Sequence, residues 1–383
     1  MQLLCLEIPY GYTRISLTAE TRWLSFIHPS FEAMPTASAS ARTVTCAVLV
    51  RSHNPLPGQL LRMREWATAL IAAGIPMHVS VDVSHGREAV ERVTEALSPL
   101  PVAIHIYDEE EMLREFPHIE RLRLRMVGED CWAGLSCPAA GTDARALAAI
   151  AAGTWRKWAG RNGTRPSSIA WGFHAEALCL WWRSVTRVPQ ESALQPGSLI
   201  PEHVWVLEDD VGFTAPLSEL IDAYSESHAD LITDTPQLSV PVSATSWAVT
   251  TEGEALHWTG WCWHDTCTEE YASLVPDECR FKTKEHAQRF SARLVEEMHR
   301  QCQAGCSAWS EQFACSLCLA LARESLSHEE HGAARRWIVE PIRPSTLPPN
   351  PKEEYGLSGH VSEEAYRRMC TDTRGVLLHA LKW

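Results

Sequence analysis

The stretch HVWVLEDDVGF, residues 203 to 213, places three consecutive acidic residues directly after an apolar run. The run His203 to Leu207 has the composition of a β-strand that is buried on both faces, as in a parallel sheet. Three adjacent carboxylates do not belong in a core, because each unpaired buried charge costs several kcal/mol. We therefore expect Glu208, Asp209 and Asp210 to lie at the end of a strand and to be held by cations.

The spacing of the three acids suggests how a cation would be held. Side chains alternate across an extended backbone, so Glu208 and Asp210 are expected to point one way and Asp209 the other. Two carboxylates on one side suit Mn²⁺ or Mg²⁺, which take oxygen ligands and keep positions open for diphosphate oxygens. Such an ion stabilises a departing nucleoside diphosphate. The alternative is a solvated acidic turn, or an acidic cap before a helix expected over residues 217–224.

Apolar and amphipathic segments alternate upstream of this motif. Strands are expected at residues 44–50, 77–83 and 102–107, with helices at 59–73 and 87–97. This βαβαβ order predicts a parallel sheet with right-handed crossovers and a ligand crevice at the carboxyl ends of its strands. The sequence therefore predicts an α/β fold, a Rossmann-related three-layer αβα sandwich with a mostly parallel central sheet.

Further elements are expected in the rest of the chain. The helical patterns lie at residues 144–158, 168–185, 285–301, 310–325 and 363–370, and the strand patterns at 230–233, 239–250 and 337–340. We expect three parts: an N-terminal extension and linker (residues 1–42), a catalytic domain (43–340) and a C-terminal tail or lid (341–383).

Composition excludes some classes of function. The 34 basic and 48 acidic residues give a formal charge of −14, which argues against a nucleic-acid-binding protein. No stretch reaches the roughly 18 apolar residues of a transmembrane helix, and the first residues do not read as a secretory signal. The thirteen cysteines are scattered, which favours mostly free, buried thiols over a disulfide framework.

The segment WVLEDDVGF resembles the DxD-type motif of GT-A glycosyltransferases, the nucleotide-diphospho-sugar transferase fold, in the form EDD. The start TCAVLVRSHN, residues 45 to 54, and the helix that precedes the motif fit the layout of that family. The resemblance spans roughly residues 44 to 340 and rests on element order. It implies a GT-A-like fold with a metal-bound sugar nucleotide at Glu208 to Asp210. The first position is Glu here, so which pair of acids binds the metal stays open.

The resemblance also implies roles for residues outside the motif. It places the nucleotide beside Asp209 and the end of the first strand, at Arg51, Ser52, His53 and Asn54. It makes His360 a candidate metal contact beside Glu208 and Asp210, and Glu311 a candidate base that deprotonates the acceptor hydroxyl. The alternative for Glu311 is a first-turn acid favoured by the helix dipole, and for His360 an ordinary surface histidine.

Two clusters suggest further sites. The stretch HWTGWCWHD, residues 257 to 265, offers indole faces and polar groups suited to a sugar acceptor, with the alternative that the indoles are core. The candidates for acceptor contacts are Trp261, Trp263, His264 and Asp265. A second set permits a zinc site by spacing, although its CxxC pair falls within an expected helix: His299, Cys302, Cys306, Cys315 and Cys318.

These observations predict a metal-dependent glycosyltransferase that moves a sugar from a nucleoside-diphosphate sugar donor to a glycan or other hydroxyl acceptor. The alternatives are a non-catalytic nucleotide- or glycan-binding relative of the fold, and a metal-dependent phosphohydrolase. The family resemblance implies the Golgi lumen for a eukaryotic member, usually behind a membrane anchor, whereas a complete chain of this sequence is expected in the cytoplasm.

Overall fold

The computed structural model describes residues 46–84, 86–120, 122, 172–187, 200–239, 246–249, 255–258, 264, 266–327, 336–348 and 361–382. The N-terminal extension and the helix expected at residues 144–158 lie outside them. In the part of the chain that is described, no helix combines the length and the apolarity needed to cross a membrane.

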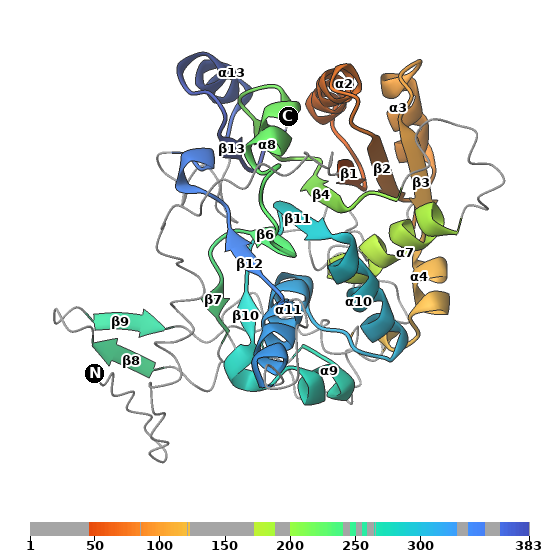
Figure 1. The fold of residues 1–383 in the computed structure, drawn as a ribbon. Coiled ribbons are helices and arrows are strands. Elements are labelled where there is room, and N and C mark those ends of the chain that lie inside the picture. Colours follow the sequence, from red (N-terminus) through yellow and green to blue (C-terminus); the bar gives the residue numbers. More distant parts are fainter. Residues whose placement is uncertain are drawn as a thin grey trace, which may run out of the picture.

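A seven-stranded sheet forms the centre of the molecule, in the order β12-β6-β11-β4-β1-β2-β3 (Figure 1). Its strands are β1 (Cys46–Ser52), β2 (Met77–Asp82), β3 (Ala103–Tyr107), β4 (His203–Glu208), β6 (Leu231–Thr233), β11 (Ala287–Ser291) and β12 (Val339–Pro341). All neighbouring pairs are parallel except those of β11, which is antiparallel to both β4 and β6. The predicted α/β fold with a mostly parallel central sheet is confirmed.

Three short strand pairs accompany the sheet. Strand β5 (Gly212–Phe213) pairs with β13 (Leu377–Leu378), β7 (Gln237–Leu238) with β10 (Phe281–Lys282), and β8 (Ser246–Val249) with β9 (Ala255–Trp258). The pair β5 and β13 joins the segment after the acidic motif to the end of the chain.

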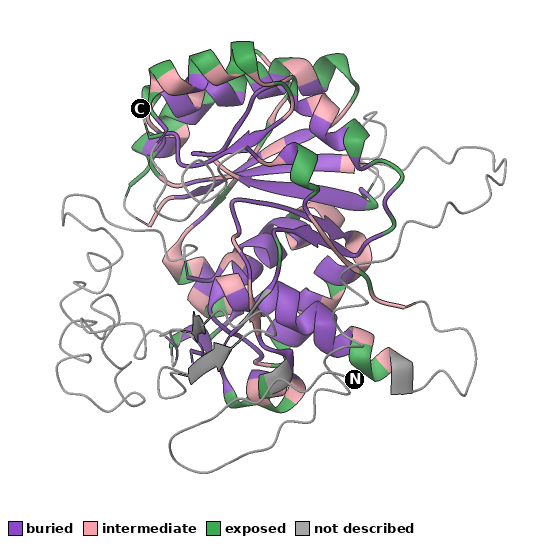
Figure 2. Cartoon of the chain, turned by 90° about the vertical axis from the view of Figure 1, so that its left-hand side faces the viewer, coloured by how far each residue is buried: buried purple, intermediate pink, exposed green. Residues whose placement is uncertain are grey.

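Helices cover both faces of the sheet and complete three layers. One layer contains α2 (Pro57–Ala72), α3 (Glu88–Leu97) and α8 (Leu217–Ala223), whose apolar side chains share one core cluster with the strands. The other contains α4 (Glu109–Glu115), α7 (His174–Thr186), α9 (Glu269–Leu274), α10 (Ala292–Gln303) and α11 (Ser310–Ser327). A last helix, α13 (Glu363–Asp372), precedes β13. Figure 2 shows the buried strands between the two helical layers.

Alternate side chains of β4 pack into the hydrophobic clusters on the two opposite faces of the sheet. Val204 and Val206 belong to the cluster with α7, whereas Trp205 and Leu207 belong to the cluster with α2. All four side chains are at most 3% exposed. The apolar run that precedes the acids is therefore a strand buried on both faces, as the sequence predicts.

The helix predicted over residues 285–301 is wrong in its first third. Residues Ala287–Ser291 form β11, and α10 starts only at Ala292, with the Ser291 hydroxyl accepting a hydrogen bond from the Leu294 amide as its cap. Pairing with two neighbouring strands outweighs the local helical pattern. The polar Arg289 is tolerated there because its guanidinium donates to the carbonyls of Tyr224, Ser227 and Ala229.

A buried carboxylate joins four segments at one side of the sheet. Asp230 is fully buried and accepts hydrogen bonds from Ser291 Oγ at 2.8 Å and the Ile338 amide at 3.1 Å. Arg293 approaches it through both Nε and Nη2, at 3.2 and 2.6 Å, and stacks over the Trp337 ring. Asp230 therefore ties β6, β11, α10 and β12 together.

Replacing Asp230 by alanine is expected to lower the free energy of unfolding by about 3 kcal/mol, because it breaks the ion pair with Arg293 and two further hydrogen bonds. Denaturant-induced unfolding measures the change, with Asp222→Ala on the exposed side of α8 as control. A loss no larger than that of the control would contradict this role of Asp230.

Glu176 on α7 is a second fully buried acid, remote from the acidic motif in sequence. Its carboxyl accepts a hydrogen bond from Ser307 Oγ and lies 4.0 Å from His118 Nε2. Burial, opposed by the Ser307 hydrogen bond, raises its pKa to about 7. The folded protein therefore holds this proton in a pH range where the unfolded chain has lost it.

The free energy of unfolding is accordingly expected to fall as pH rises. The contribution of Glu176 is fully present below its unfolded pKa of about 4.5 and is lost as pH rises through about 7. The free energy of unfolding is compared between about pH 5 and pH 8 for the two proteins. The decrease over this range should be about 1–3 kcal/mol smaller for Glu176→Gln than for the wild type. Equilibrium unfolding at both pH values checks this. Equal pH dependence in the two proteins would show that Glu176 ionises normally.

Candidate metal centre

The acidic motif lies where β4 and β1 end side by side. The two strands are parallel, with Arg51 paired to Glu208 in register. Their last residues therefore lie at the carboxyl edge of the sheet, where ligands bind in open α/β sheets. Strand alternation sends Asp209 toward α2, where Gln59 contacts it, and Glu208 to the opposite side of the strand, where His286 contacts it.

Two histidines that are distant in sequence meet the acids on one side. His286 Nδ1 lies 2.7 Å from Glu208 Oε2. His379 Nε2 lies 3.6 Å from the same oxygen and 3.4 Å from Asp210 Oδ1. Lys382 Nζ lies 3.4 Å from Asp210 Oδ2. Glu208 and Asp210 thus share His379, which fits the expectation that they point the same way.

The fold explains why these histidines reach the acids. His286 comes immediately before β11, which is antiparallel to β4 and pairs Ala287 with Leu207. His379 follows β13, which pairs with β5 directly after the acidic motif. The two imidazole rings stack, with centroids 3.4 Å apart and an angle of 13° between their planes.

This set of side chains fits a divalent cation. A group that could hold a metal ion has three or more His, Cys, Asp or Glu side chains whose ligand atoms all lie within 4.8 Å of one another. Among the residues that the structure describes, one such group is found, and it consists of Glu208, His286 and His379. Carboxylate oxygens together with imidazole nitrogens suit Mn²⁺ better than Mg²⁺, which prefers oxygen ligands and retained water. The His299 and cysteine set does not form such a group among the described residues.

The surroundings of the motif shift the pKa values of its three acids in different directions. Burial opposes ionisation of Glu208, but the His286 contact and the charge of Arg51 outweigh it and hold the pKa well below its usual range. Burial likewise opposes ionisation of Asp210, yet His379 and Lys382 lower its pKa. Both carboxylates are therefore charged near neutral pH, as metal ligands must be.

The same surroundings keep His286 neutral. Burial, with a smaller effect of His379, lowers the pKa of His286 to about 4. A neutral ring beside a carboxylate presents its Nδ1–H as the donor, so His286 donates to Glu208. Such a hydrogen bond fixes the orientation of the carboxylate.

Asp209 has different partners on the opposite side of the strand. It accepts hydrogen bonds from Ser52 Oγ at 2.7 Å and from Gln59 Nε2 at 3.1 Å. Burial and the charge of Asp210 raise its pKa to about 7. Asp209 and Ser52, both predicted to contact the nucleotide, therefore contact each other.

The other residues predicted to contact the nucleotide are Arg51, His53 and Asn54, the sequence neighbours of Ser52. His53 Nδ1 lies 4.0 Å from Asp82 Oδ2 at the end of β2, and Asn54 Oδ1 accepts from Arg92 Nη2 at 2.5 Å. Arg51 Nη2 lies 3.6 Å from Glu208 Oε1 and donates to the Glu285 carbonyl at 3.0 Å. The structure thus brings the end of β1 to the acidic motif.

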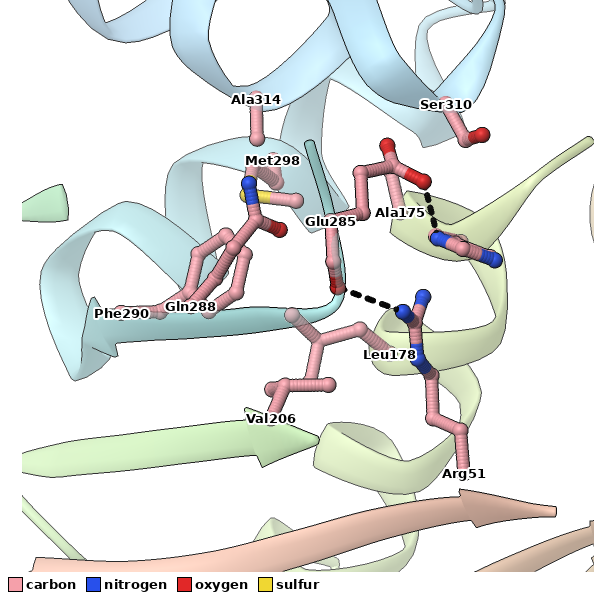
Figure 3. Close-up of a pocket in the computed structure, with 11 residues that line it drawn as sticks. Arg51, Ala175, Leu178, Val206, Glu285, Gln288, Phe290, Met298, Ser310 and Ala314 are labelled. Carbon is pink, nitrogen blue, oxygen red and sulfur yellow. Dashed lines mark hydrogen bonds and ion pairs between the residues drawn. The ribbon is translucent and has the colours of Figure 1, made fainter. Parts of the chain in front are cut away.

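A small cavity of about 10 Å³ lies beneath this edge of the sheet, between β4, β11, α7 and α11 (Figure 3). Arg51 and Glu285 both line it, and the Glu285 carboxylate contacts His174 Nδ1. A space of this size accommodates at most about one water molecule. It is too small for a nucleotide or a sugar.

Glu311, the predicted base, lies in the first turn of α11. Its carbonyl accepts a hydrogen bond from the Thr283 amide at 2.8 Å, which ties the start of α11 to the segment before β11. Burial, followed by the charge of Glu285, raises the pKa of Glu311 to about 8. A carboxyl group with a pKa near neutral is suited to proton transfer.

The predicted acceptor residues are only partly described. His264 is 2% exposed, with Nδ1 at 2.8 Å from Ser239 Oγ and Nε2 at 3.5 Å from Arg280 Nη1. Trp261, Trp263 and Asp265 lie outside the described residues, as does His360.

Sequence reasoning missed His286 and His379 as members of the site. His286 was hidden by the helical pattern assigned to its segment, although a strand there would have placed it beside the end of β4. The HALKW end of the chain gives no local signal, because only the pairing of β13 with β5 brings His379 to the acids.

No protein-family model and no curated protein sequence matches the chain. Among solved structures, it is similar to mouse xyloside xylosyltransferase 1 in its apo form, at 8% identity and a TM-score of 0.32, over 89% of this chain and 98% of that one. It is similar to core-mannan synthase A from Aspergillus fumigatus in its Mn/GDP form, at 10% identity and a TM-score of 0.33, over 83% and 82%.

A third similar structure is 4-diphosphocytidyl-2C-methyl-D-erythritol synthase from Anaerococcus prevotii, at 7% identity and a TM-score of 0.33, over 78% of this chain and 88% of that one. Similarity of this degree assigns neither a family nor a function to the chain.

Proposed function

We propose that this chain is a metal-dependent glycosyltransferase of the GT-A type, which moves a sugar from a nucleoside-diphosphate donor to a glycan or other hydroxyl acceptor. One observation carries the proposal: two ionised carboxylates, Glu208 and Asp210, leave the carboxyl edge of a mostly parallel sheet on the same side and meet two imidazoles there. A solvated acidic turn would not gather buried histidines around its acids.

The residues of this centre have separate tasks in the proposal. Glu208, Asp210 and His379 hold the cation, and His286 fixes the orientation of Glu208 by its hydrogen bond. A bound Mn²⁺ neutralises the negative charge that develops on the departing diphosphate. The Lys382 side chain is 53% exposed beside Asp210, so its ammonium group is available to a phosphate oxygen. His360 stays a further candidate for the cation.

The nucleotide is proposed to lie along the end of β1, beside Arg51 to Asn54. Ser52 and Asp209 support this edge through their mutual hydrogen bond, and His53 lies at the boundary with β2. On the acceptor side, Glu311 is proposed as the base that deprotonates the acceptor hydroxyl. The proposed contacts to the acceptor come from Trp261, Trp263, His264 and Asp265.

Calorimetric titration tests the proposal with a panel of nucleoside diphosphates, in the presence and absence of Mn²⁺. The wild type is expected to bind one of them in a metal-dependent manner, and Asp210→Ala is expected to lose this binding. If the folded wild type binds no nucleoside diphosphate under either condition, the transferase assignment fails. Binding without sugar transfer to any acceptor would favour a non-catalytic relative of the fold.

A further inference from the structure

The last described residues of the chain pack against the segment that follows the acidic motif. Residues 361–382, here called the C-terminal segment, contain α13 and β13 and bury a small core of their own, made by Val361, Tyr366, Val376, Leu378 and Leu381. Strand β13 pairs with β5, and Tyr366 Oη donates to the Phe213 carbonyl at 3.3 Å. Whatever holds this segment in place also places His379.

Arg62 on α2 contacts both the acidic motif and the C-terminal segment. Its side chain is 1% exposed, and its Nη2 donates to the Asp209 carbonyl at 3.1 Å and to the Leu381 carbonyl at 3.0 Å. The Leu381 amide in turn donates to the Asp210 carbonyl at 2.7 Å. Leu381 is therefore held through both its backbone groups, one residue before Lys382 and two after His379.

A glycine makes this close approach possible. A Cβ atom on Gly212 would lie 2.3 Å from Leu381 Cδ1 and 2.8 Å from Tyr366 Cε2, so any side chain there forces the segment to shift. Leu381 is fully buried and has little room to yield. Gly212 and Arg62 thus control the same contact from different elements.

Arg62 is a charged residue that lies almost fully buried. Burying a guanidinium is costly unless it makes hydrogen bonds, and both carbonyls it contacts belong to segments that carry candidate metal ligands. Neither of these two hydrogen bonds goes to a candidate ligand side chain. Its effect on the centre would therefore pass through the backbone of the C-terminal segment.

We propose that Arg62 is a positioning residue, which fixes the C-terminal segment against the acidic motif so that His379 completes the metal centre. The proposal rests on the metal-binding role given to this centre above. It makes metal binding and docking of the segment reciprocal, since each stabilises the arrangement that the other requires.

The test compares Arg62→Met with the wild type and with Arg64→Met. Arg64 lies on the same helix but is exposed and donates to the Ala96 carbonyl, away from the C-terminal segment. Arg62→Met is expected to weaken Mn²⁺ binding by about tenfold, within the usual range of coupling between sites, and Arg64→Met to leave it unchanged. Arg62→Lys, which keeps a cationic donor, is expected to recover part of the loss.

Hydrogen exchange at the Leu381 amide provides the second readout. Without metal, Arg62→Met and Gly212→Ala are each expected to speed this exchange, while the amides of β4 stay as protected as in the wild type. In the wild type, Mn²⁺ is expected to slow the exchange further. Protected β4 amides show that a variant is folded, and Gly212→Ala provides an independent variant if Arg62→Met does not fold.

The outcomes separate this proposal from the function on which it rests. If the wild type does not bind Mn²⁺, the proposed function fails, and with it the coupling to metal. If the wild type binds Mn²⁺ but Arg62→Met binds it equally well with unchanged exchange at Leu381, Arg62 does not position the segment. Faster exchange with unchanged Mn²⁺ affinity also overturns the proposal, because the segment would then be dispensable for the metal.

Discussion

Replacing Glu208 by glutamine is expected to lower the affinity for Mn²⁺ by more than about 100-fold, because losing even an outer-shell partner costs about 10–100-fold at metal sites. The amide keeps the size of the side chain but removes the charge that Arg51 and His286 hold in place. It also presents a weaker ligand to the cation. Sugar transfer is expected to fall by at least the same factor at metal concentrations that saturate the wild type.

Calorimetry with Mn²⁺ measures the affinity of Glu208→Gln, with Glu226→Gln as the matched control on an exposed turn after α8. The control is expected to bind Mn²⁺ like the wild type. A folded Glu208→Gln variant with wild-type affinity would remove Glu208 from the metal centre.

Replacing Glu311 by glutamine is expected to slow sugar transfer by about 100- to 10,000-fold while leaving nucleoside-diphosphate binding within about threefold of wild type, as for the loss of a general base. The two effects are expected to separate because Glu311 lies on α11 and is not one of the residues proposed to hold the cation. In the wild type, the rate is expected to rise with pH as the group ionises near its pKa of about 8. This rise should be absent from the variant.

Single-turnover rates across a range of pH values measure the effect, with Glu324→Gln on the same helix as control. An alternative role for Glu311 is that of a first-turn acid that stabilises α11 by about 0.3–1 kcal/mol. In that case Glu311→Gln would unfold slightly more easily and transfer sugar at the wild-type rate, which would end its assignment as the base.

The parts of the fold predicted from sequence are those in which one local pattern decides the outcome. The strands β1 and β4 contain apolar runs with two valines each, β2 alternates apolar and polar residues, and the acidic residues that begin at Glu208 mark the end of β4. β11 was missed because its sequence AQRFS carries polar residues that only the folded sheet satisfies. Gln288, for example, donates to Thr233 Oγ1 on the neighbouring strand.

The candidate site was predictable only where its residues are neighbours in sequence. The three acids are adjacent in the sequence and could be found there directly. Strand alternation alone predicted that Glu208 and Asp210 point to one side and Asp209 to the other. His286 and His379 come from segments about 80 and 170 residues away, and strand pairings over such distances follow no local rule. The general expectation of a histidine contact near the C-terminal end of the chain pointed instead to His360, outside the described residues.

The central claim is that Glu208, Asp210 and His379 hold a divalent cation at the edge of the sheet. Crystals of the wild type grown with Mn²⁺ test it most directly, through the anomalous scattering of the metal. The account predicts a peak among these three side chains, with Mn–O and Mn–N distances of about 2.0–2.3 Å, in the range of divalent-metal bonds to such ligands. An ordered site in which the same side chains enclose no anomalous peak at saturating Mn²⁺ would contradict it.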